Sequence, residues 1–148
     1  METQFPELLA ALQACPAHKR GEPPVVPRLT GVYLFTEGSQ ARYVGRTRDF
    51  NRRLGQHTAP KSTHRQSAYA FKIAKEEARN AGISVIGTRR EIAVEPGFDA
   101  IFSAAKKRVR RMEFRFVEVN EPRVSAVFEV YASIVLGTDV DVNDWETS

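Results

Sequence analysis

Two short segments, each containing a glycine and a tyrosine, limit most strongly how this chain can fold. The first is Gly31–Phe35, the second is Arg42–Gly45, and a turn over Glu37–Gln40 that contains Gly38 separates them. Runs of β-branched and aromatic residues on either side of a glycine-containing turn are typical of a β-hairpin. The sequence therefore predicts two neighbouring antiparallel strands over these segments.

The predicted hairpin is followed by two helical patterns. Asp49 is a suitable N-cap for a helix over Phe50–His57, because its carboxylate can accept hydrogen bonds from the first free backbone N–H groups. Apolar residues spaced three and four apart predict a longer helix over Ser67–Ala81, which Gly82 ends. The segment Ile83–Pro96 is ambiguous, because short strand-like patches alternate with a glycine and paired arginines.

The last part of the chain predicts one more strand between two helices. Asp99 is placed to cap a basic helix that runs to about Arg111. Polar and apolar residues then alternate over Glu113–Val119, which is typical of a strand with one solvated face. Glu121–Leu136 has apolar residues at helical spacing and a proline in its first turn, and it is the clearest helix pattern of the sequence.

The N-terminal segment holds most of the prolines. Leucines on one face predict a short amphipathic helix over Glu7–Ala14, and an extended arm over Ala17–Arg28 follows it. We therefore divide the chain into residues 1–28, the N-terminal helix and proline-rich arm, and residues 29–148, the main domain. Both a packed arrangement and an arm that reaches to a partner protein fit this pattern.

The order of these elements predicts an α+β fold. A small three-stranded antiparallel sheet would be flanked by helices, and extra helices would be inserted between the helix over Phe50–His57 and the third strand. A chain of 148 residues is about one domain long, which is enough to bury a core of its own.

Basic residues are concentrated in two blocks. One lies between Arg42 and Arg65 and the other between Lys106 and Arg115, whereas Gly137–Ser148 is acidic. The formal net charge of the whole chain is only +4, so the distribution says more than the total. Clustered bases of this kind indicate a polyanionic partner such as nucleic acid, although two solvated helix faces would give the same pattern.

Several classes of protein are disfavoured by what the sequence lacks. No apolar run approaches the roughly 20 residues that span a bilayer, and Met1–Cys15 does not have the basic-then-apolar pattern of a signal peptide. The single cysteine, Cys15, excludes an internal disulfide and a cysteine-rich zinc site. We therefore expect a cytoplasmic protein that makes no contact with a membrane.

The tyrosines of the hairpin stand in a fixed order with an arginine and a histidine. Gly-Val-Tyr at 31–33 and Tyr-Val-Gly at 43–45 are followed by Arg53, ten residues after the second tyrosine, and by His57. This order resembles the GIY-YIG nuclease motif, with valine for isoleucine in both triplets, a change of one methylene that a strand tolerates. The spacing selects Arg53 over Arg52, which is rotated by about 100° around the helix. The resemblance implies a small stand-alone GIY-YIG nuclease.

The resemblance also implies a metal-binding glutamate on a later helix and an asparagine near the end of the domain. Glu129 fits the first, since it is the one acid in the helix pattern that follows Arg123. Asn143 fits the second and would buttress the site. We expect one divalent cation, Mg²⁺ or alternatively Mn²⁺, because these ions accept a single carboxylate completed by water and phosphate oxygens.

The same resemblance implies a role for each site residue in the hydrolysis of a phosphodiester bond to 5′-phosphate and 3′-hydroxyl ends. Tyr33 and His57 would activate the attacking water, and Tyr43 would help to hold it. Arg53 would clamp the scissile phosphate through its charged planar fork, and Glu129 would hold the metal ion. The basic residues expected to contact DNA are Arg46, Arg52, Lys106, Lys107, Arg110 and Arg111.

Two other classes of function remain as alternatives. A non-catalytic nucleic-acid-binding module could keep the same fold, and a scaffold protein could dock through its proline-rich arm. The presence of Tyr33, Arg53 and Glu129 favours the enzyme over both. For the enzyme, single- and double-stranded DNA both fit, as do a homodimer and a partner protein bound through the N-terminal arm.

Overall fold

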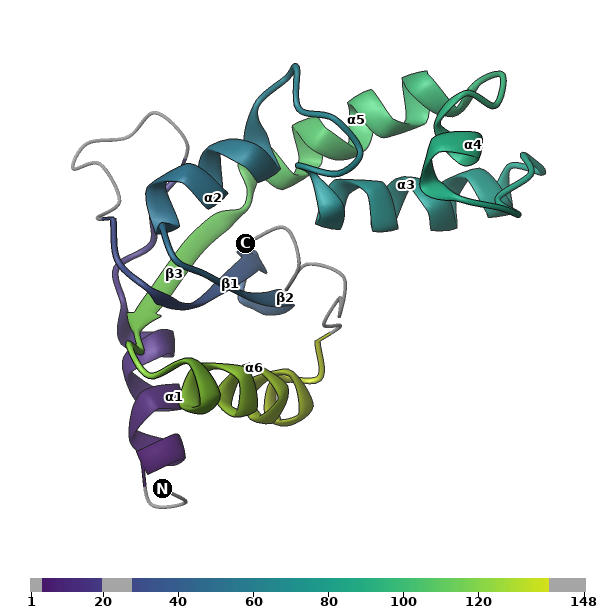
Figure 1. The fold of residues 1–148 in the computed structure, drawn as a ribbon. Helices are drawn as coiled ribbons and strands as arrows, with labels where there is room; N and C mark the ends of the chain where they lie inside the picture. Colours follow the sequence, from purple (N-terminus) through teal and green to yellow (C-terminus); the bar gives the residue numbers. More distant parts are fainter. Residues whose placement is uncertain (1–3, 20–27, 139–148) are drawn as a thin grey trace. The chain divides into compact units, whose positions relative to one another are not determined.

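The computed structural model describes residues 4–19 and 28–138 of the chain. Within them the elements follow one another as α1 (Gln4–Ala14), β1 (Gly31–Glu37), β2 (Gln40–Thr47), α2 (Phe50–Thr58), α3 (Ala68–Asn80), α4 (Arg89–Ala93), α5 (Phe98–Arg111), β3 (Glu113–Glu118) and α6 (Pro122–Leu136) (Figure 1). The strands form one antiparallel sheet in the order β2-β1-β3. The predicted α+β class, with a three-stranded sheet and helices inserted before its third strand, is confirmed.

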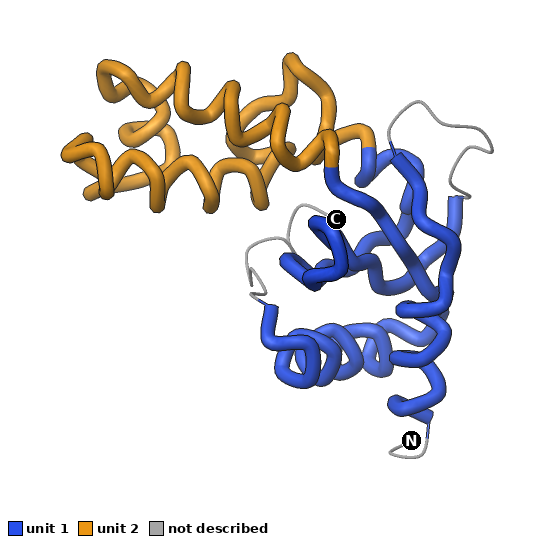
Figure 2. The backbone as a smooth tube through the Cα atoms, turned by 180° about the vertical axis from the view of Figure 1, so that it is seen from behind, with its two compact units in different colours: residues 1–54, 112–148 blue, residues 55–111 orange. Residues whose placement is uncertain are grey.

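The chain divides into two compact units, which Figure 2 shows in different colours. Unit 1 consists of Met1–Leu54 and Met112–Ser148, and unit 2 is the continuous segment Gly55–Arg111. Unit 1 holds the sheet with α1 and α6, and unit 2 holds α3, α4 and α5. The boundary falls inside α2, so that helix begins in unit 1 and ends in unit 2.

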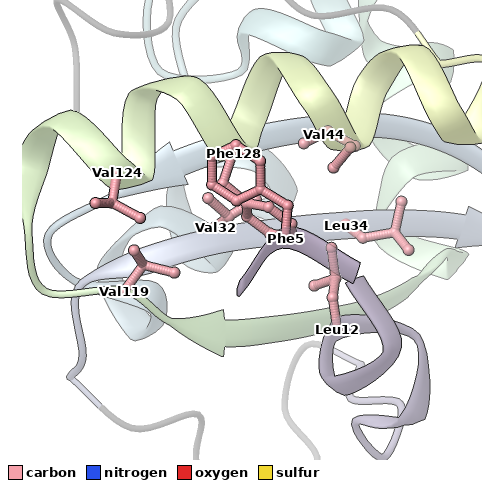
Figure 3. Close-up of a cluster of buried hydrophobic side chains, with 9 residues drawn as sticks. Phe5, Leu12, Val32, Leu34, Val44, Val119, Val124 and Phe128 are labelled. Atoms are coloured by element: carbon pink, nitrogen blue, oxygen red, sulfur yellow. The ribbon is translucent and has the colours of Figure 1, made fainter. Parts of the chain in front are cut away.

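One face of the sheet in unit 1 is covered by α1 and α6. Val32, Leu34 and Val44 on the strands pack with Phe128 and other apolar residues of α6 in a buried cluster (Figure 3). Helix α1 adds Phe5, whose ring centroid lies 5.9 Å from that of Phe128. The N-terminal helix is therefore part of the core of unit 1, whereas residues 20–27 of the predicted arm lie outside the described residues.

The other face of the sheet carries an aromatic cluster. Phe35 and Phe114 are fully buried and meet edge to face, with ring centroids 5.2 Å apart. Phe50, the first residue of α2, places its ring 4.7 Å from that of Phe116. Because side chains alternate across a strand, these aromatic residues face away from α1 and α6.

Unit 2 is a small helical unit built on α3 and α5. Phe71 of α3 packs against Phe98 and Phe102 of α5, with centroid distances of 5.5 Å and 6.1 Å. An ion pair between Arg108 and Glu77, at 3.8 Å, links the same two helices. Small residues such as Ala74, which is fully buried, let the helices pack closely.

Local capping decides where several helices begin and end. Asp49 accepts a hydrogen bond from the Arg52 backbone N–H at 3.0 Å, so its predicted capping role is confirmed. The carboxylate of Glu121 accepts from the Val124 backbone N–H in the same way, and Gly137 ends α6 in the left-handed conformation at φ 69°. These caps explain why α2 begins, and α6 begins and ends, close to the predicted bounds.

The structure resolves one ambiguous segment and contradicts one local prediction. The ambiguous segment Ile83–Pro96 contains the short helix α4 and no strand, because Thr88 and Glu91 form a capping box that starts a helix. Asp99 is not an N-cap, since α5 already begins at Phe98, whose backbone N–H donates to the carbonyl of Glu95 at 3.0 Å. Asp99 then lies in the first turn, where a carboxylate is favoured by the helix dipole.

Among the described residues, no helix is long and apolar enough to cross a membrane.

Candidate active site

Tyr33 lies on the central strand of the sheet and extends its phenol across the edge strand β2. It pairs with Gly45 on that strand, and its side chain is fully buried. A Cβ atom at Gly45 would overlap the Cζ atom and the hydroxyl oxygen of Tyr33. Glycine at this position therefore leaves the gap through which the phenol reaches the edge of the sheet.

The first glycine of the hairpin has a different purpose. A Cβ atom at Gly31 would overlap the backbone of β3 at Val117 and Glu118. The close approach of β1 and β3 at this point sets the register in which Tyr33 is paired with Phe116. Phe114, two residues earlier on β3, stacks on the Tyr33 ring at 5.3 Å and fixes its orientation.

Arg53 on α2 contacts the Tyr33 hydroxyl. Its Nε–H donates a hydrogen bond to that oxygen at 3.4 Å, and its side chain is only 1% exposed. The Asp49 cap fixes the start of α2 and so the face on which Arg53 lies. Arg52 is exposed, as expected for the adjacent position on a helix.

Tyr43 joins this group from the edge strand. Its side chain is fully buried, and its ring centroid lies 6.4 Å from that of Tyr33. The two tyrosines and Arg53 all belong to unit 1 and lie on the face of the sheet that α2 begins to cover. The structure thus brings three of the predicted site residues together.

Glu129 reaches strand β2 from the opposite face of the sheet. It lies on α6 with its carboxylate 0% exposed, and its Oε1 atom is 3.9 Å from the Nε atom of Arg46. Arg46 also donates from Nη1 to the carbonyl of Pro122 at 3.4 Å. Since Arg46 pairs with Val32, it shares the face of the sheet that packs against α6.

The predicted residues therefore form two groups, one on each face of β2. Tyr33, Tyr43 and Arg53 lie on one face, and Glu129 lies on the other beside Arg46. Gly45 and Arg46 are consecutive on the edge strand. The space that Tyr33 occupies at Gly45 and the ion pair between Arg46 and Glu129 therefore lie at adjacent residues of β2. The sequence predicts Arg46 only as a DNA-binding residue, and no local pattern indicates its contact with Glu129.

The remaining predicted residues belong to unit 2 or lie outside the described residues. His57 is fully buried and follows Arg53 by one turn of α2, within unit 2. Lys107, Arg110 and Arg111 are exposed on α5, whereas Lys106 is partly buried. Asn143 lies outside the described residues. The roles of all these residues remain predictions.

The donor set limits the kind of metal that unit 1 could hold. Among the described residues, no three or more His, Cys, Asp or Glu side chains cluster as they do in a closed metal site. A single buried carboxylate at Glu129 fits a hard cation such as Mg²⁺, which keeps several waters and takes further oxygens from a phosphate. It does not fit structural zinc, which needs four protein ligands.

Comparison with known families identifies the hairpin and the helix that follows it. Residues 29–93 match the model of the GIY-YIG catalytic domain. The match includes Tyr33, Tyr43, Arg53 and His57, and it ends before Glu129. Over residues 29–93 it confirms the resemblance that the order of the tyrosines, arginine and histidine indicated. No curated protein and no solved structure matches the chain.

Proposed function

The chain carries a GIY-YIG catalytic domain, which is a nuclease domain, at residues 29–93, and from this premise we propose that it is a metal-dependent DNA endonuclease. The observation that supports this best is the hydrogen bond from Arg53 to the Tyr33 hydroxyl, beside the gap at Gly45. It joins a proton acceptor and a permanent cation at the edge of a sheet, where one phosphodiester group could meet both.

Tyr33 acts in this proposal on the attacking water. A phenol is a weak base at neutral pH, and in this site the Arg53 guanidinium donates a hydrogen bond to its oxygen. The Tyr33 oxygen would take a proton from the water as that water attacks phosphorus and the 3′ oxygen leaves. His57 would assist this proton transfer, and Tyr43 would orient the water.

Arg53 acts on the phosphate. Its planar fork of N–H donors can bridge two phosphate oxygens and stabilise the charge that builds on them during attack. Because the guanidinium is almost fully covered, DNA has to displace neighbouring side chains to reach it. Asn143 would support the site from outside the described residues.

Glu129 would hold the divalent cation, Mg²⁺ or Mn²⁺, which supplies Lewis-acid stabilisation of the leaving 3′ oxygen when it is bound. The carboxylate is covered, and the Arg46 guanidinium lies 3.9 Å from it. We propose that Arg46 is the group that moves when the carboxylate takes up its ligand. A guanidinium released from Glu129 could then turn to a phosphate of the DNA, which is the role that the sequence predicted for Arg46.

The expected setting follows from the same chemistry. Nucleases of this family act on DNA, and the exposed bases Arg52, Lys107, Arg110 and Arg111 would hold its backbone. Hydrolysis would leave 5′-phosphate and 3′-hydroxyl ends. The free thiol of Cys15 suits the reducing cytoplasm that we expect for the protein.

The test is a cleavage assay with supercoiled plasmid and with single-stranded DNA, in Mg²⁺, in Mn²⁺ and in EDTA. The variants are Glu129→Ala and, as a matched control, Glu118→Ala, which removes an exposed carboxylate from β3 of the same unit. We expect metal-dependent cutting that Glu118→Ala keeps and Glu129→Ala loses by about a thousandfold or more, while DNA binding changes little.

Metal-dependent cleavage of either substrate supports the proposal. The substrate that is cut faster shows whether the enzyme prefers single- or double-stranded DNA. Wild-type turnover in Glu129→Ala would overturn the metal assignment. If neither substrate is cut while both are bound, the protein is a nucleic-acid-binding module that has kept the nuclease fold.

A further inference from the structure

Unit 2 contains a small pocket that the proposed cleavage chemistry does not use. It lies at the middle of α5 and has a volume of about 60 Å³. The side chains that line it are Thr58, Pro60, Ser103, Lys106, Lys107 and Arg110. A water molecule occupies about 30 Å³ of liquid, so the pocket holds a group of a few heavy atoms and is far too small for a nucleoside.

Lys106 lines one side of this pocket. Its ammonium donates hydrogen bonds to the carbonyls of Pro60 at 2.8 Å and of Ser62 at 2.9 Å. It also lies 4.5 Å from the centre of the Phe102 ring. Burial lowers the pKa of Lys106, and Asp99 opposes this shift. These contacts tie the loop after α2 to α5, so the pocket is formed before any ligand arrives.

Lys107 and Arg110 supply the charge that faces outward. Ser103, Lys107 and Arg110 are separated by four and three residues, so they follow one face of α5, and all three are exposed. Thr58 adds a second hydroxyl from the end of α2. Two cations and two hydroxyl groups around so small a volume suit a ligand with one centre and several acceptor oxygens.

We propose that this pocket binds a single phosphate group, and that its natural source is the backbone of the nucleic acid that the protein cuts. The second half of the proposal rests on the proposed function. A phosphate fits the volume, while the attached sugar and base must stay outside the pocket. The exposed cation Arg111 lies next to Arg110 on α5 and extends the positive surface on which a strand could continue.

The experiment measures binding in EDTA, so that no cleavage takes place, with the full chain and fluorescent single- and double-stranded oligonucleotides. The double variant Lys107→Gln/Arg110→Gln is compared with Lys75→Gln/Arg79→Gln, which removes the same charge from α3 in the same unit. We expect the α5 variant to bind DNA about ten- to a hundredfold more weakly than the wild type, with a salt slope smaller by about one to two. The α3 variant should lose much less affinity.

A second arm uses inorganic phosphate and pyrophosphate as probes, by calorimetry and by competition with the oligonucleotide. Binding of either probe by the wild type, lost in the α5 variant, supports the phosphate site. If the probes lose binding in that variant but DNA does not, the phosphate site stands and the backbone as its source is overturned. If both double variants behave alike toward both ligands, the proposal is overturned.

Thermal denaturation of each variant shows whether it is folded, and Ser103→Ala offers a milder test that keeps all charges. Loss of this hydroxyl donor should weaken phosphate binding by about three- to tenfold. Because no arm reads cleavage, this proposal can fail while the nuclease activity is established. A chain that binds phosphate here but never cuts DNA would contradict the proposed function and leave the phosphate site itself standing.

Discussion

The two units of this chain differ in the burial of the charged residues to which we assign a function. In unit 1, Arg53 and Glu129 are buried, and each contacts a polar group of the same unit, the Tyr33 hydroxyl and the Arg46 guanidinium. In unit 2, Lys107 and Arg110 are exposed on α5. The difference matches two tasks, because a reacting group gains from a fixed, dry setting whereas a group that collects a polyanion must be reachable from solvent.

The cores of the two units differ as well. Unit 1 closes both faces of a sheet with large side chains such as Phe128 and Phe114, so its residues are fixed by contacts distant in sequence. Unit 2 packs α3 on α5 through alanines and a few phenylalanines, such as Ala74 and Phe98. Under the proposed function, precise positioning of reacting groups and electrostatic attraction of DNA would be supplied by separate parts of a short chain.

The largest expected effect concerns the gap at β2. Gly45→Ala adds a methyl group where Tyr33 now lies, so the phenol must move, and we expect the cleavage rate to fall by about a hundredfold or more. Gly55→Ala is the control, because a Cβ atom there meets nothing and alanine favours the helix by about 0.5–1 kcal/mol. Plasmid nicking rates and thermal denaturation check both variants. Full activity in Gly45→Ala would remove Tyr33 from the reaction.

The second prediction asks whether the units unfold separately. Phe98→Ala in unit 2 and Phe128→Ala in unit 1 each delete a fully buried ring, at a cost of about 3–5 kcal/mol. We expect Phe98→Ala to speed hydrogen exchange in α3 and α5 and to leave β1 protected, and Phe128→Ala to do the reverse. The same increase in exchange across the whole chain in both variants would show that the units form one cooperative structure.

A third, smaller effect concerns the ion pair of Glu129. Arg46→Gln removes a positive charge 3.9 Å from the carboxylate, so the chain without DNA should bind Mn²⁺ about tenfold more tightly. Arg42→Gln is the matched control, because Arg42 pairs with Glu37 on the surface at 3.3 Å. Electron paramagnetic resonance of free Mn²⁺ measures the affinity. Equal affinity in both variants would mean that Arg46 does not compete with a cation for Glu129.

The smallest effect concerns unit 2 and pH. Burial, followed by the charges of Arg65 and Arg89, lowers the pKa of His64 below its ordinary value of 6.5. The unfolded chain then binds the proton more readily, so acidification through 6.5 should reduce the free energy of unfolding until the lower folded pKa is passed. Thermal denaturation above and below 6.5 should show a smaller pH dependence in His64→Gln. An unchanged dependence would remove His64 as its source.

Local signals were enough to predict much of the fold. The hairpin with Tyr33 and Tyr43, the Asp49 cap and the helix of Glu129 all depend on residues within a few positions of one another. Helix α4 is also encoded locally, since Thr88 and Glu91 have the spacing of a capping box. It was not predicted because the paired arginines and Gly87 are also typical of a loop or an interrupted strand.

Contacts between distant segments could not be predicted in this way. Arg46 meets Glu129 only because the β-sheet register places Arg46 beside Val32, on the face that α6 covers. The same holds for Phe5, whose burial depends on where α1 packs, and for the pocket that joins Thr58 to α5. The residues of the candidate site could be predicted from the sequence, but the contacts among them depend on tertiary packing.

The split of unit 1 along the chain has a consequence for the order of synthesis. Domains fold as the chain leaves the ribosome, N-terminal parts first. Unit 2 is continuous and emerges complete at Arg111, whereas unit 1 still lacks β3 and α6 at that moment. A nascent chain of this length already carries the basic helix α5 but has neither the third strand nor Glu129. Truncated translation products would therefore lack the carboxylate to which we assign the metal ion, and under the proposed function they would not cut DNA.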